Sequence, residues 1–463
     1  MLCLSVFATD SELSRRQRVR ALKHTIPTRL VKRAIRKVRP RPRACPVVPD
    51  ELAVWLVIGL SLFCTDALRQ VWRWLVAFST KLAVPERNTL CMARRRIGPR
   101  ILIELAKQVL HPLAHPATPG AYYKGMALRG VDCCNLSLFD SPANRAVFNP
   151  PRKPKRKRRG GRRPPPAFPQ AKLCCLCELG THAMLHWGLK PAHWADCNMV
   201  VPLLGHVEKG QLLMWDAAFY SAANLDLVRQ RGAHLLGRLS WSLKPHKLRA
   251  LSDGSYLAEL CIGRRGKGRR PIYGPVVRII EYKLRGMKST HHKKHRLLTT
   301  LLDEHACPAV ELAELYHRRW EVELTIDELE THQLQQRVLV SQTPGGVVQE
   351  VAGLLIAHWL VRKLMFEASV KAGVPPLRIS FTGTLKLIRC RLAEAGDTPA
   401  RQRRWWTHLV EEVAAEEVID PRRPRVNPRV LKRTTFDFRK KKPRDRSPRP
   451  DVPAFHKAFR VLH

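Results

Sequence analysis

The chain has 463 residues, which is enough for two or three domains with large buried cores. It carries 83 Lys and Arg against 38 Asp and Glu, a formal net charge of +45. Because a compact domain gains nothing from such self-repulsion, the excess indicates a polyanionic partner: DNA, RNA or an anionic membrane surface. The 13 scattered cysteines are typical of reduced cytoplasmic thiols and argue against a disulfide framework.

The first residues, MLCLSVFA, lack the basic start and the apolar length of a secretory signal. The apolar run from Ala53 to Cys64 falls short of the ~20 residues that a membrane span needs, so we interpret it as a buried helix. The sequence therefore predicts a cytoplasmic protein without a membrane partner.

Residues 1–45 are basic and dotted with proline, and we expect a helical or partly disordered arm that lies on phosphates. From residue 46 to 118 apolar positions recur at helical spacing, which predicts an all-α domain. From these residues alone, a plain helical bundle is as good an interpretation as a DNA-binding domain.

At Met126 the periodicity changes to that of strands. The segment MALRGVDCCNLSLFD predicts a strand, a short turn and a second strand, with Asp132 at the end of the first. A strand end is a usual place for a functional carboxylate in an α/β fold. Asp140, at the start of DSPAN, is interpreted as a turn residue.

Residues 151–166, PRKPKRKRRGGRRPPP, form a dense basic run whose Pro and Gly argue against regular structure. We expect an exposed loop between two strands that binds phosphate groups, with nuclear localisation as the alternative interpretation. The candidate contacts are nine cations: Arg152, Lys153, Lys155, Arg156, Lys157, Arg158, Arg159, Arg162 and Arg163.

Further buried strands are predicted in QAKLCCLCELGTHAML and QLLMWDAAFY, and Asp216 lies near the end of the second. In the first segment, Cys174, Cys177, His182 and His186 have the spacing C-x2-C-x4-H-x3-H. A zinc finger usually has about a dozen residues between its ligand pairs, so a buried strand is the favoured interpretation.

Between residues 235 and 300, the runs RLSWSL, SYLAELCI, IYGPVVRIIEYKL and HRLLTTLL predict a β-rich region. Trp241 in this region could stack on an exposed base. A buried structural tryptophan is the more common outcome.

The segment from Ala309 to Gln335 is interpreted as one helix. At about 100° per residue, Tyr316, Arg319, Glu323 and Glu330 fall on one polar face. A carboxylate flanked by Tyr and Arg can hold a metal while its neighbours hold a phosphate. The alternative interpretation of this face is a surface helix with Glu–Arg pairs and no function in binding. The neighbouring apolar stripe consists of Val322, Ile326 and Leu329.

Beyond this segment we predict a long buried helix from Gly345 to Ala368 and an amphipathic helix from Leu385 to Ala395. Arg, Lys and Pro then dominate residues 401–463, which we interpret as a basic C-terminal tail that is largely unstructured after about Asp420.

The run YHRRWEVE resembles the Tyr-x2-Arg-x3-Glu-x6-Lys signature of the DDE transposases of bacterial insertion sequences, in the group named after insertion element four. RLLTTLLDEHACPAVELAELYHRRWEVEL and SQTPGGVVQEVAGLLIAHWLVRKLM are similar to the segments on either side of that family's catalytic glutamate. LFCTDALRQVWRWL and ERNTLCMARRRIG resemble its N-terminal DNA-binding helical domain.

The resemblance implies an α/β fold: a ribonuclease H-like catalytic core with a β-rich insertion, preceded by an all-α N-terminal domain. The implied divisions are a basic arm (1–45), a helical DNA-binding domain (46–118), the first part of the core (119–225), the β-rich insertion (226–305), the second part of the core (306–400) and the basic tail (401–463).

The resemblance also implies that Asp132, Asp216 and Glu323 are the catalytic and metal-binding triad. Two Mg²⁺ ions, with Mn²⁺ as a substitute, are the expected cofactors. Tyr316 and Arg319 would position a phosphate or Glu323 itself. The implied activity is cut-and-paste transposition, with metal-dependent strand cleavage and strand transfer. The expected partner is double-stranded DNA, both terminal inverted repeats and target, bound by a homodimer at the bacterial nucleoid.

Three residues depart from the family pattern. Glu330 stands in place of the signature lysine, Ala217 in place of an arginine after the second aspartate, and Cys133 in place of a glycine after the first. Arg337 is the candidate substitute for the lysine. These departures favour a catalytically impaired relative that only binds DNA. A basic nucleic-acid-binding protein with no active site is a third interpretation, which leaves the three aligned carboxylates unexplained.

Overall fold

The computed structural model describes residues 25–40, 48–76, 84–149, 168–265, 270–284, 294–394, 398–421, 457 and 459–461. The chain forms two compact units: unit 1 is Met1–His206 with Glu321–Ile419, and unit 2 is Val207–Trp320 with Asp420–His463. Each unit contains helices and strands, and the N-terminal region is helical. The predicted mixed α/β class with a helical N-terminal region is confirmed.

Unit 1 begins with a group of helices. They are α2 (Thr28–Val38), α3 (Asp50–Leu62), α4 (Leu68–Val76) and α5 (Arg87–Val109). Helix α3 is buried on nearly every side, which suits a sequence that is apolar all round and confirms the buried helix predicted at this place. Asp50 links the group, because its carboxylate accepts from Arg39 Nη1 and Arg96 Nε, each at 2.9 Å.

The strands of unit 1 form an antiparallel sheet in which β2 pairs with β3 and β3 with β4. The strands are β1 (Tyr122–Tyr123, paired with β2), β2 (Met126–Ser137), β3 (Gln170–Glu178) and β4 (Met184–Pro191). The turn predicted after Val131 is wrong, since β2 continues through it with Asp132 opposite Cys175. Local composition suggested a break, whereas unbroken pairing with β3 keeps the segment extended.

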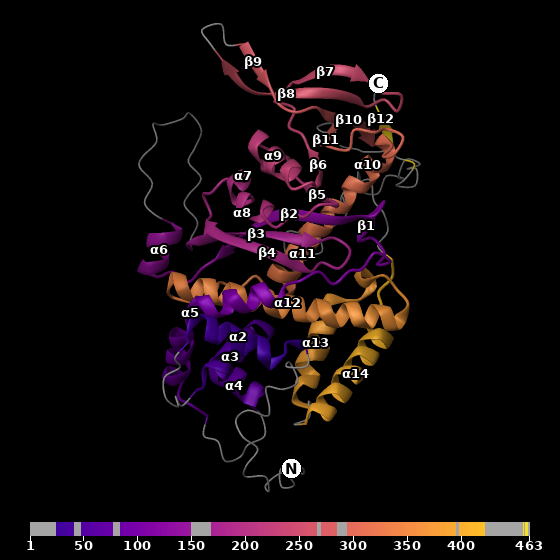
Figure 1. Ribbon diagram of the computed structural model, residues 1–463. Coiled ribbons are helices and arrows are strands. Elements are labelled where there is room, and N and C mark those ends of the chain that lie inside the picture. Colours follow the sequence, from indigo (N-terminus) through magenta and orange to yellow (C-terminus); the bar gives the residue numbers. More distant parts are fainter. Residues whose placement is uncertain are drawn as a thin grey trace, which may run out of the picture. The chain divides into compact units, whose positions relative to one another are not determined.

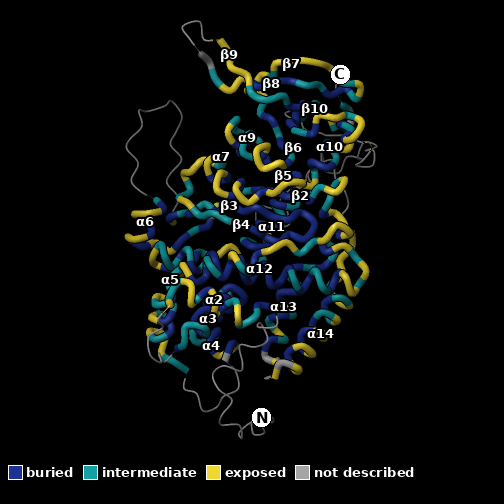
Figure 2. The backbone as a smooth tube through the Cα atoms, in the orientation of Figure 1, coloured by how far each residue is buried: buried dark blue, intermediate teal, exposed yellow. Residues whose placement is uncertain are grey.

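Helix α12 (Pro344–Ala372) lies between this sheet and helices α3 and α5 (Figure 1). By length and composition it could cross a membrane, but 72% of its apolar window is buried inside the protein, as in a core helix (Figure 2). The buried helix predicted from residue 345 to 368 is therefore confirmed. A Cβ on Gly353 would lie 2.7 Å from Val57 Cγ1, so glycine allows the close approach of α3.

The C-terminal helices of unit 1 extend into the region predicted as the basic tail. They are α13 (Phe381–Arg391), near the predicted amphipathic helix, and α14 (Pro399–Glu416). Residues 401–416, which composition placed in the basic C-terminal region, form most of α14, and the largely unstructured part is expected only after about Asp420. Trp405, Trp406, Leu409 and Val413 are buried at helical spacing, and this apolar stripe holds the segment on the core despite its many arginines.

Short helices complete unit 1: α6 (Pro142–Phe148), α7 (Asp196–Met199) and α8 (Val201–Leu204). Asp140, interpreted as a turn residue, lies at the surface before α6 and binds Arg145 Nη2 at 2.6 Å.

Unit 2 is built on a sheet in which β5 and β6 are parallel and the other pairs are antiparallel. Its strands are β5 (Gln211–Trp215), β6 (His234–Arg238), β7 (Pro245–Ala250), β8 (Tyr256–Arg265), β9 (Arg270–Tyr273), β10 (Val277–Leu284), β11 (His295–Thr299) and β12 (Phe459–Val461). Its helices are α9 (Ala222–Gln230), which joins the parallel pair, and α10 (Ala309–Tyr316).

The β-rich region predicted between residues 235 and 300 is confirmed in three of its four runs. The run RLSWSL is wrong as a strand, because β6 ends at Arg238 and residues 241–243 turn. The hydroxyls of Ser240 and Ser242 lie 2.8 Å apart and stabilise this turn, and β7 starts only at Pro245.

Candidate catalytic site

Asp132 lies in the middle of β2, where it is half-buried. Its Oδ1 accepts a hydrogen bond of 2.8 Å from the backbone of Cys133. Because side chains alternate along a strand, Asp132 shares one face with Gly130 and Cys134. A Cβ on Gly130 would lie 2.2 Å from Val322 Cγ2, so only glycine allows the helix of Val322 to pack on this face.

Glu323 follows Val322 on α11 (Trp320–Asp327) and is half-buried. The predicted apolar stripe of this segment is confirmed, since Val322, Ile326 and Leu329 are buried. Val322, the first residue of this stripe, packs against Gly130 on the strand face that carries Asp132. Within unit 1, therefore, α11 carries Glu323 along the face of β2 on which Asp132 lies.

The single helix predicted from residue 309 to 335 is wrong. After α10 the chain winds as a 3₁₀ turn (His317–Arg319), then as α11, then as a π turn (Glu328–Gln333). Each change of winding alters the angle per residue, so one helical wheel cannot place Tyr316 and Glu330 on a common face. Tyr316 and Arg319 belong to unit 2, whereas Glu323 and Glu330 belong to unit 1.

In unit 2, Asp216 directly follows β5, which confirms the predicted position at a strand end. Its Oδ1 accepts from the backbone of Ala217 at 2.7 Å and caps a 3₁₀ turn. The hydroxyl of Tyr316 donates to the carbonyl of Trp215 at 3.2 Å. Asp216 and Tyr316 are therefore fixed next to one another at the end of β5.

Arg319 completes this group, because its guanidinium lies 5.8 Å from the centre of the Tyr316 ring. Burial raises the pKa of Tyr316 above its ordinary value, while the charge of Arg319 lowers it and that of Asp216 raises it. Unit 2 thus brings together Asp216 and the two residues predicted to position a phosphate.

Glu330 lies against the same strand as Asp132. Its carboxyl is hydrogen-bonded with the thiol of Cys134, and burial raises its pKa above the ordinary value. Arg337, the candidate substitute for the family lysine, donates through Nη1 to the carbonyl of Cys64 at 2.8 Å. The position of the family lysine thus holds a half-buried acid.

The four residues with zinc-like spacing do not converge. Cys174 and Cys177 are three residues apart on β3, so their side chains point to opposite faces. Both ring nitrogens of His182 face carboxylates, Nε2 towards Glu321 at 2.9 Å and Nδ1 towards Glu328 at 2.8 Å. No motif in the sequence predicted these two contacts.

In the part of the chain that the structure describes, no three His, Cys, Asp or Glu side chains are placed so as to hold a metal ion. Mg²⁺ usually binds one or two carboxylates together with substrate phosphates and water, without an all-protein cage. The carboxylate oxygens of Asp132, Asp216 and Glu323 are the donor type that this ion prefers. They fit Mg²⁺ chemically, and metal binding by the triad stays a prediction.

The nine cations predicted to bind phosphates lie outside the described residues: Arg152, Lys153, Lys155, Arg156, Lys157, Arg158, Arg159, Arg162 and Arg163. Trp241 is 41% exposed, so the favoured interpretation of a buried tryptophan is wrong. The guanidinium of Arg296 lies 3.9 Å from the centre of its ring.

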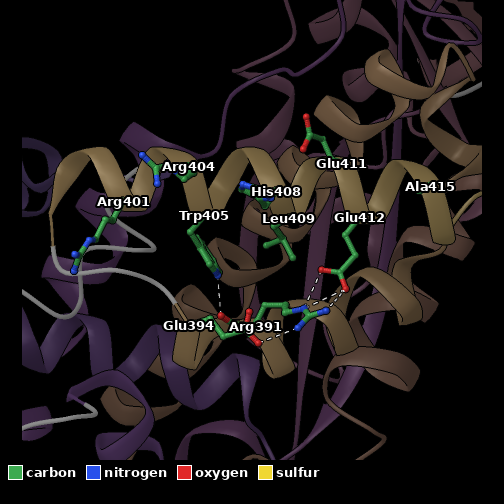
Figure 3. Close-up of a pocket in the computed structure, with 10 residues that line it drawn as sticks. All are labelled: Arg391, Glu394, Arg401, Arg404, Trp405, His408, Leu409, Glu411, Glu412 and Ala415. Atoms are coloured by element: carbon green, nitrogen blue, oxygen red, sulfur yellow. Dashed lines mark hydrogen bonds and ion pairs between the residues drawn. The ribbon is translucent and has the colours of Figure 1, made fainter. Parts of the chain in front are cut away.

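A groove of about 730 Å³ lies between α13 and α14 (Figure 3). Arg391 on one wall binds Glu412 at 2.6 Å and Glu394 at 2.9 Å, so its charge is neutralised within the groove. Trp405 closes the groove, its indole nitrogen donating to the Arg391 carbonyl at 2.7 Å. None of the residues predicted for catalysis lines this groove.

The chain matches two family models. The model described as "Transposase DDE domain" matches residues 137–360, and the model described as "Insertion element 4 transposase N-terminal" matches residues 16–106. A curated relative is the transposase InsG for insertion sequence element IS4 from Escherichia coli (strain K12). It is 26% identical over 402 residues, which cover 84% of this chain and 87% of the relative.

A solved structure with a similar chain course is the cryo-EM structure of the piggyBac transposase synaptic complex with hairpin DNA. The two share 11% sequence identity with a TM-score of 0.39, over 90% of this chain and 87% of that one.

The match to a transposase DDE domain, preceded by a match to a transposase N-terminal model over the helical N-terminal region, defines the class of protein as a DDE transposase. This chain belongs to the insertion-element-four family of these transposases. The predicted family membership is confirmed, and the ribonuclease H-like type of core stays a prediction. The family acts on DNA in transposition, its activity is of the polynucleotidyl transferase type, and its members use divalent metal ions.

Proposed function

We propose that this transposase cleaves DNA at the ends of an insertion sequence and joins those ends to target DNA. Asp132, Asp216 and Glu323 are the proposed catalytic carboxylates. The observation that carries the proposal is the packing of α11 on β2, with Val322 against Gly130. This packing supports a shared role for Asp132 and Glu323, and family membership supports the same role for Asp216.

The three carboxylates would hold two Mg²⁺ ions, which activate the attacking water or 3′-hydroxyl and stabilise the leaving oxygen. Arg319 and Tyr316 of unit 2 would have different roles, one on the substrate and one on Asp216. Arg319 presents a planar guanidinium that can bind a phosphate through two N–H groups. Tyr316 supports the loop after β5 through its bond to the Trp215 carbonyl, and so orients Asp216.

DNA would be bound mainly through its phosphates. Helix α2 falls within the predicted arm and turns five exposed cations to one side, with Val31 and Ala34 buried on the other. These cations are Arg29, Lys32, Arg33, Arg36 and Lys37. The basic loop between residues 151 and 166 would add further phosphate contacts.

The remaining parts of the proposal follow from the family. The six divisions of the chain predicted above are the proposed domains, and helix α14 supplies residues 401–416 of the last one. The protein would act as a homodimer on paired terminal inverted repeats, in the bacterial cytoplasm at the nucleoid.

Single substitutions of the triad test the proposal. Asp132→Asn, Asp216→Asn and Glu323→Gln should each lower Mg²⁺-dependent cleavage of terminal-repeat DNA roughly a thousandfold, because several kcal/mol of transition-state stabilisation is lost. DNA affinity, measured in the same buffer without metal, should stay within about twofold of the unmodified chain, because phosphate contacts dominate it. Asp140→Asn is the matched control and should cleave normally, since Asp140 pairs with Arg145 at the surface.

The second candidate function is DNA binding without catalysis, and Glu330 is the observation that favours it. An acid in place of the family lysine would repel a phosphate near the active carboxylates. If terminal-repeat DNA is bound but remains uncut in both Mg²⁺ and Mn²⁺, this candidate replaces the first.

A further inference from the structure

His182 occupies an unusual position in unit 1. It lies in the turn between β3 and β4, is fully buried, and has a φ of +58°. Residues other than glycine rarely adopt this left-handed backbone, and a buried histidine in it costs free energy. Its backbone N–H donates to the carbonyl of Glu178 at 2.9 Å, which fixes the turn and aims the ring inward.

The ring of His182 joins two carboxylates of the segment that carries Glu323. Nε2 lies 2.9 Å from Glu321 Oε2, and Nδ1 lies 2.8 Å from Glu328 Oε1. Glu321 and Glu328 are seven residues apart, about two turns of helix, and Glu323 lies between them. The ring therefore holds this segment at two points, one on each side of Glu323.

Glu328, the second of these two carboxylates, is also bound by side chains of helix α12. Arg362 Nε donates to Glu328 Oε2 at 2.8 Å, its Nη2 binds Oε1, and His358 Nε2 lies 3.3 Å from Oε2. Burial alone would raise the pKa of Glu328, but Arg362 and His182 outweigh it and keep that pKa well below its ordinary value. Glu328 is therefore a carboxylate that accepts from Arg362, and Nη2 of the same arginine also lies 2.5 Å from His182 Nδ1.

The winding of the chain changes at the same place. The π turn Glu328–Gln333 begins at the residue held by His182 and Arg362. Such turns are frequent at functional sites. A buried charged network is also a costly way to stabilise a core, because apolar packing of the same volume is often at least as stable. A role in positioning the segment that carries Glu323 therefore explains this network better than stabilisation of the core alone does.

We propose that His182 is a positioning residue that ties α11 to the sheet on both sides of Glu323. The turn that carries His182 continues directly from β3, which pairs with β2 beside Asp132. The tie therefore fixes Glu323 relative to Asp132 along the strand. The proposal rests on the proposed function, in which these two carboxylates share metal ions.

The test compares His182→Asn with Glu178→Gln. Asparagine tolerates the left-handed backbone but cannot join both carboxylates. Glu178 is the matched control, because it is buried in the same turn and its carboxylate binds Arg129, Thr181 and the backbone of residues 113 and 114, all away from α11. Both variants remove part of a buried ionic network, so both should lower the melting temperature.

Three readouts separate positioning from stability. In His182→Asn, backbone amides of residues 320–334 should exchange faster with solvent. Mn²⁺ affinity, measured by electron paramagnetic resonance without DNA, should fall about 10- to 100-fold, as is common when a group supporting a metal ligand is removed. The single-turnover cleavage rate on pre-bound terminal-repeat DNA should fall to a similar extent, with DNA affinity unchanged. Glu178→Gln should change none of the three.

If the three readouts changed equally in His182→Asn and Glu178→Gln, His182 would only stabilise the fold. Unchanged amide exchange and Mn²⁺ affinity in His182→Asn would also overturn the proposal. If His182→Asn does not fold, Glu321→Gln provides the same comparison, because it removes one of the two points and leaves Glu328 in place. If the unmodified chain binds Mn²⁺ but never cleaves, the proposed function fails, while amide exchange and Mn²⁺ affinity still test the tie.

Discussion

At the scale of single residues, Glu330, which stands in place of the family's signature lysine, is the departure from the family pattern with the clearest chemical consequence. It lies on the segment that packs against β2, with its carboxyl bonded to the thiol of Cys134. A negative charge there would repel a phosphate bound near Asp132, and such repulsion can cost several kcal/mol where water is scarce.

We predict that Glu330→Lys increases the cleavage rate on terminal-repeat DNA about tenfold or more, since about 1.4 kcal/mol corresponds to a factor of ten. Glu330→Gln, which removes the negative charge without adding a positive one, should fall between the lysine variant and the unmodified chain. The measurement is a side-by-side cleavage assay under single-turnover conditions.

The pH dependence gives an internal control. Burial raises the pKa of Glu330, so its carboxyl becomes neutral at a higher pH than an exposed glutamate does. The difference in cleavage rate between Glu330→Gln and the unmodified chain should therefore shrink as pH falls through this raised pKa. Equal or lower activity in Glu330→Lys would mean that the chain holds the phosphate in another way.

For the proposed triad, the sequence predicted the residues themselves but not the side chains that surround them. Asp132, Asp216 and Glu323 could be named only because short motifs resemble a family. Their surroundings could not be named, since His182 owes its contacts to Glu321 and Glu328, which are more than 130 positions away along the chain. Spacing within 13 residues suggested a weak zinc motif and concealed the longer-range partners.

At the scale of elements, helix α2 is the clearest candidate surface for DNA. Its 11 residues include no acid, and its exposed cations recur at i, i+3, i+4 and i+7. Lys37 is partly neutralised, because it binds Glu104 at 2.7 Å. The cations Lys32, Arg33 and Arg36 are the better candidates for phosphate contacts.

We predict that Lys32→Gln, Arg33→Gln and Arg36→Gln, combined, weaken binding to specific and unrelated duplexes alike. The slope of log affinity against log salt should become shallower by about 0.9 for each phosphate that the variant no longer neutralises. The control removes the same charge from three cations that lie outside α2 and already pair with acids: Arg229, Lys363 and Lys371. An equally weakened control would mean that net charge, and not this surface, sets the affinity.

Deleting residues 152–163 from the predicted basic loop should have the same uniform effect on specific and unrelated DNA. An affinity unchanged for both would show that the loop does not contact DNA.

The elements also show where sequence patterns mislead. Helix α14 was assigned to a tail because Arg401, Arg403 and Arg404 dominate its composition, although Trp405 and Trp406 supply a buried face. The segment from residue 309 to 335 has an apolar spacing that fits an ordinary α-helix, so nothing in it reveals the 3₁₀ and π turns. Those changes of winding depend on partners elsewhere in the fold, such as Trp215 for Tyr316 and Arg362 for Glu328.

At the scale of the whole molecule, the class of fold could be predicted because strand and helix periodicities alternate clearly along the chain. The division of the chain into two units could not be predicted from the sequence. Residues 321–419 return to the unit that contains the N-terminal helices, and no local pattern marks that return. Long-range packing, such as Gly353 of α12 against Val57 of α3, determines it.

The high positive charge and two half-buried histidines together predict how stability depends on pH. Burial lowers the pKa of His186 in unit 1 to about 4, helped by the charges of His206 and Arg129. Burial likewise lowers the pKa of His317 in unit 2 to about 4, helped by His295 and Arg319. In the unfolded chain both would titrate near pH 6.5.

Between pH 6.5 and about 4 the unfolded chain therefore binds more protons than the folded one, and the free energy of unfolding should fall as pH falls through this window. His186→Gln and His317→Gln should each flatten the slope by less than about 1.4 kcal/mol per pH unit, because both rings are partly exposed and solvent screens the effect. Urea denaturation at pH 7, 6, 5 and 4 measures the slope, and His305→Gln, at an exposed histidine, is the control. A slope that stays the same in both variants would mean that these rings are already protonated in the fold, and that repulsion within a chain of charge +45 alone drives acid unfolding.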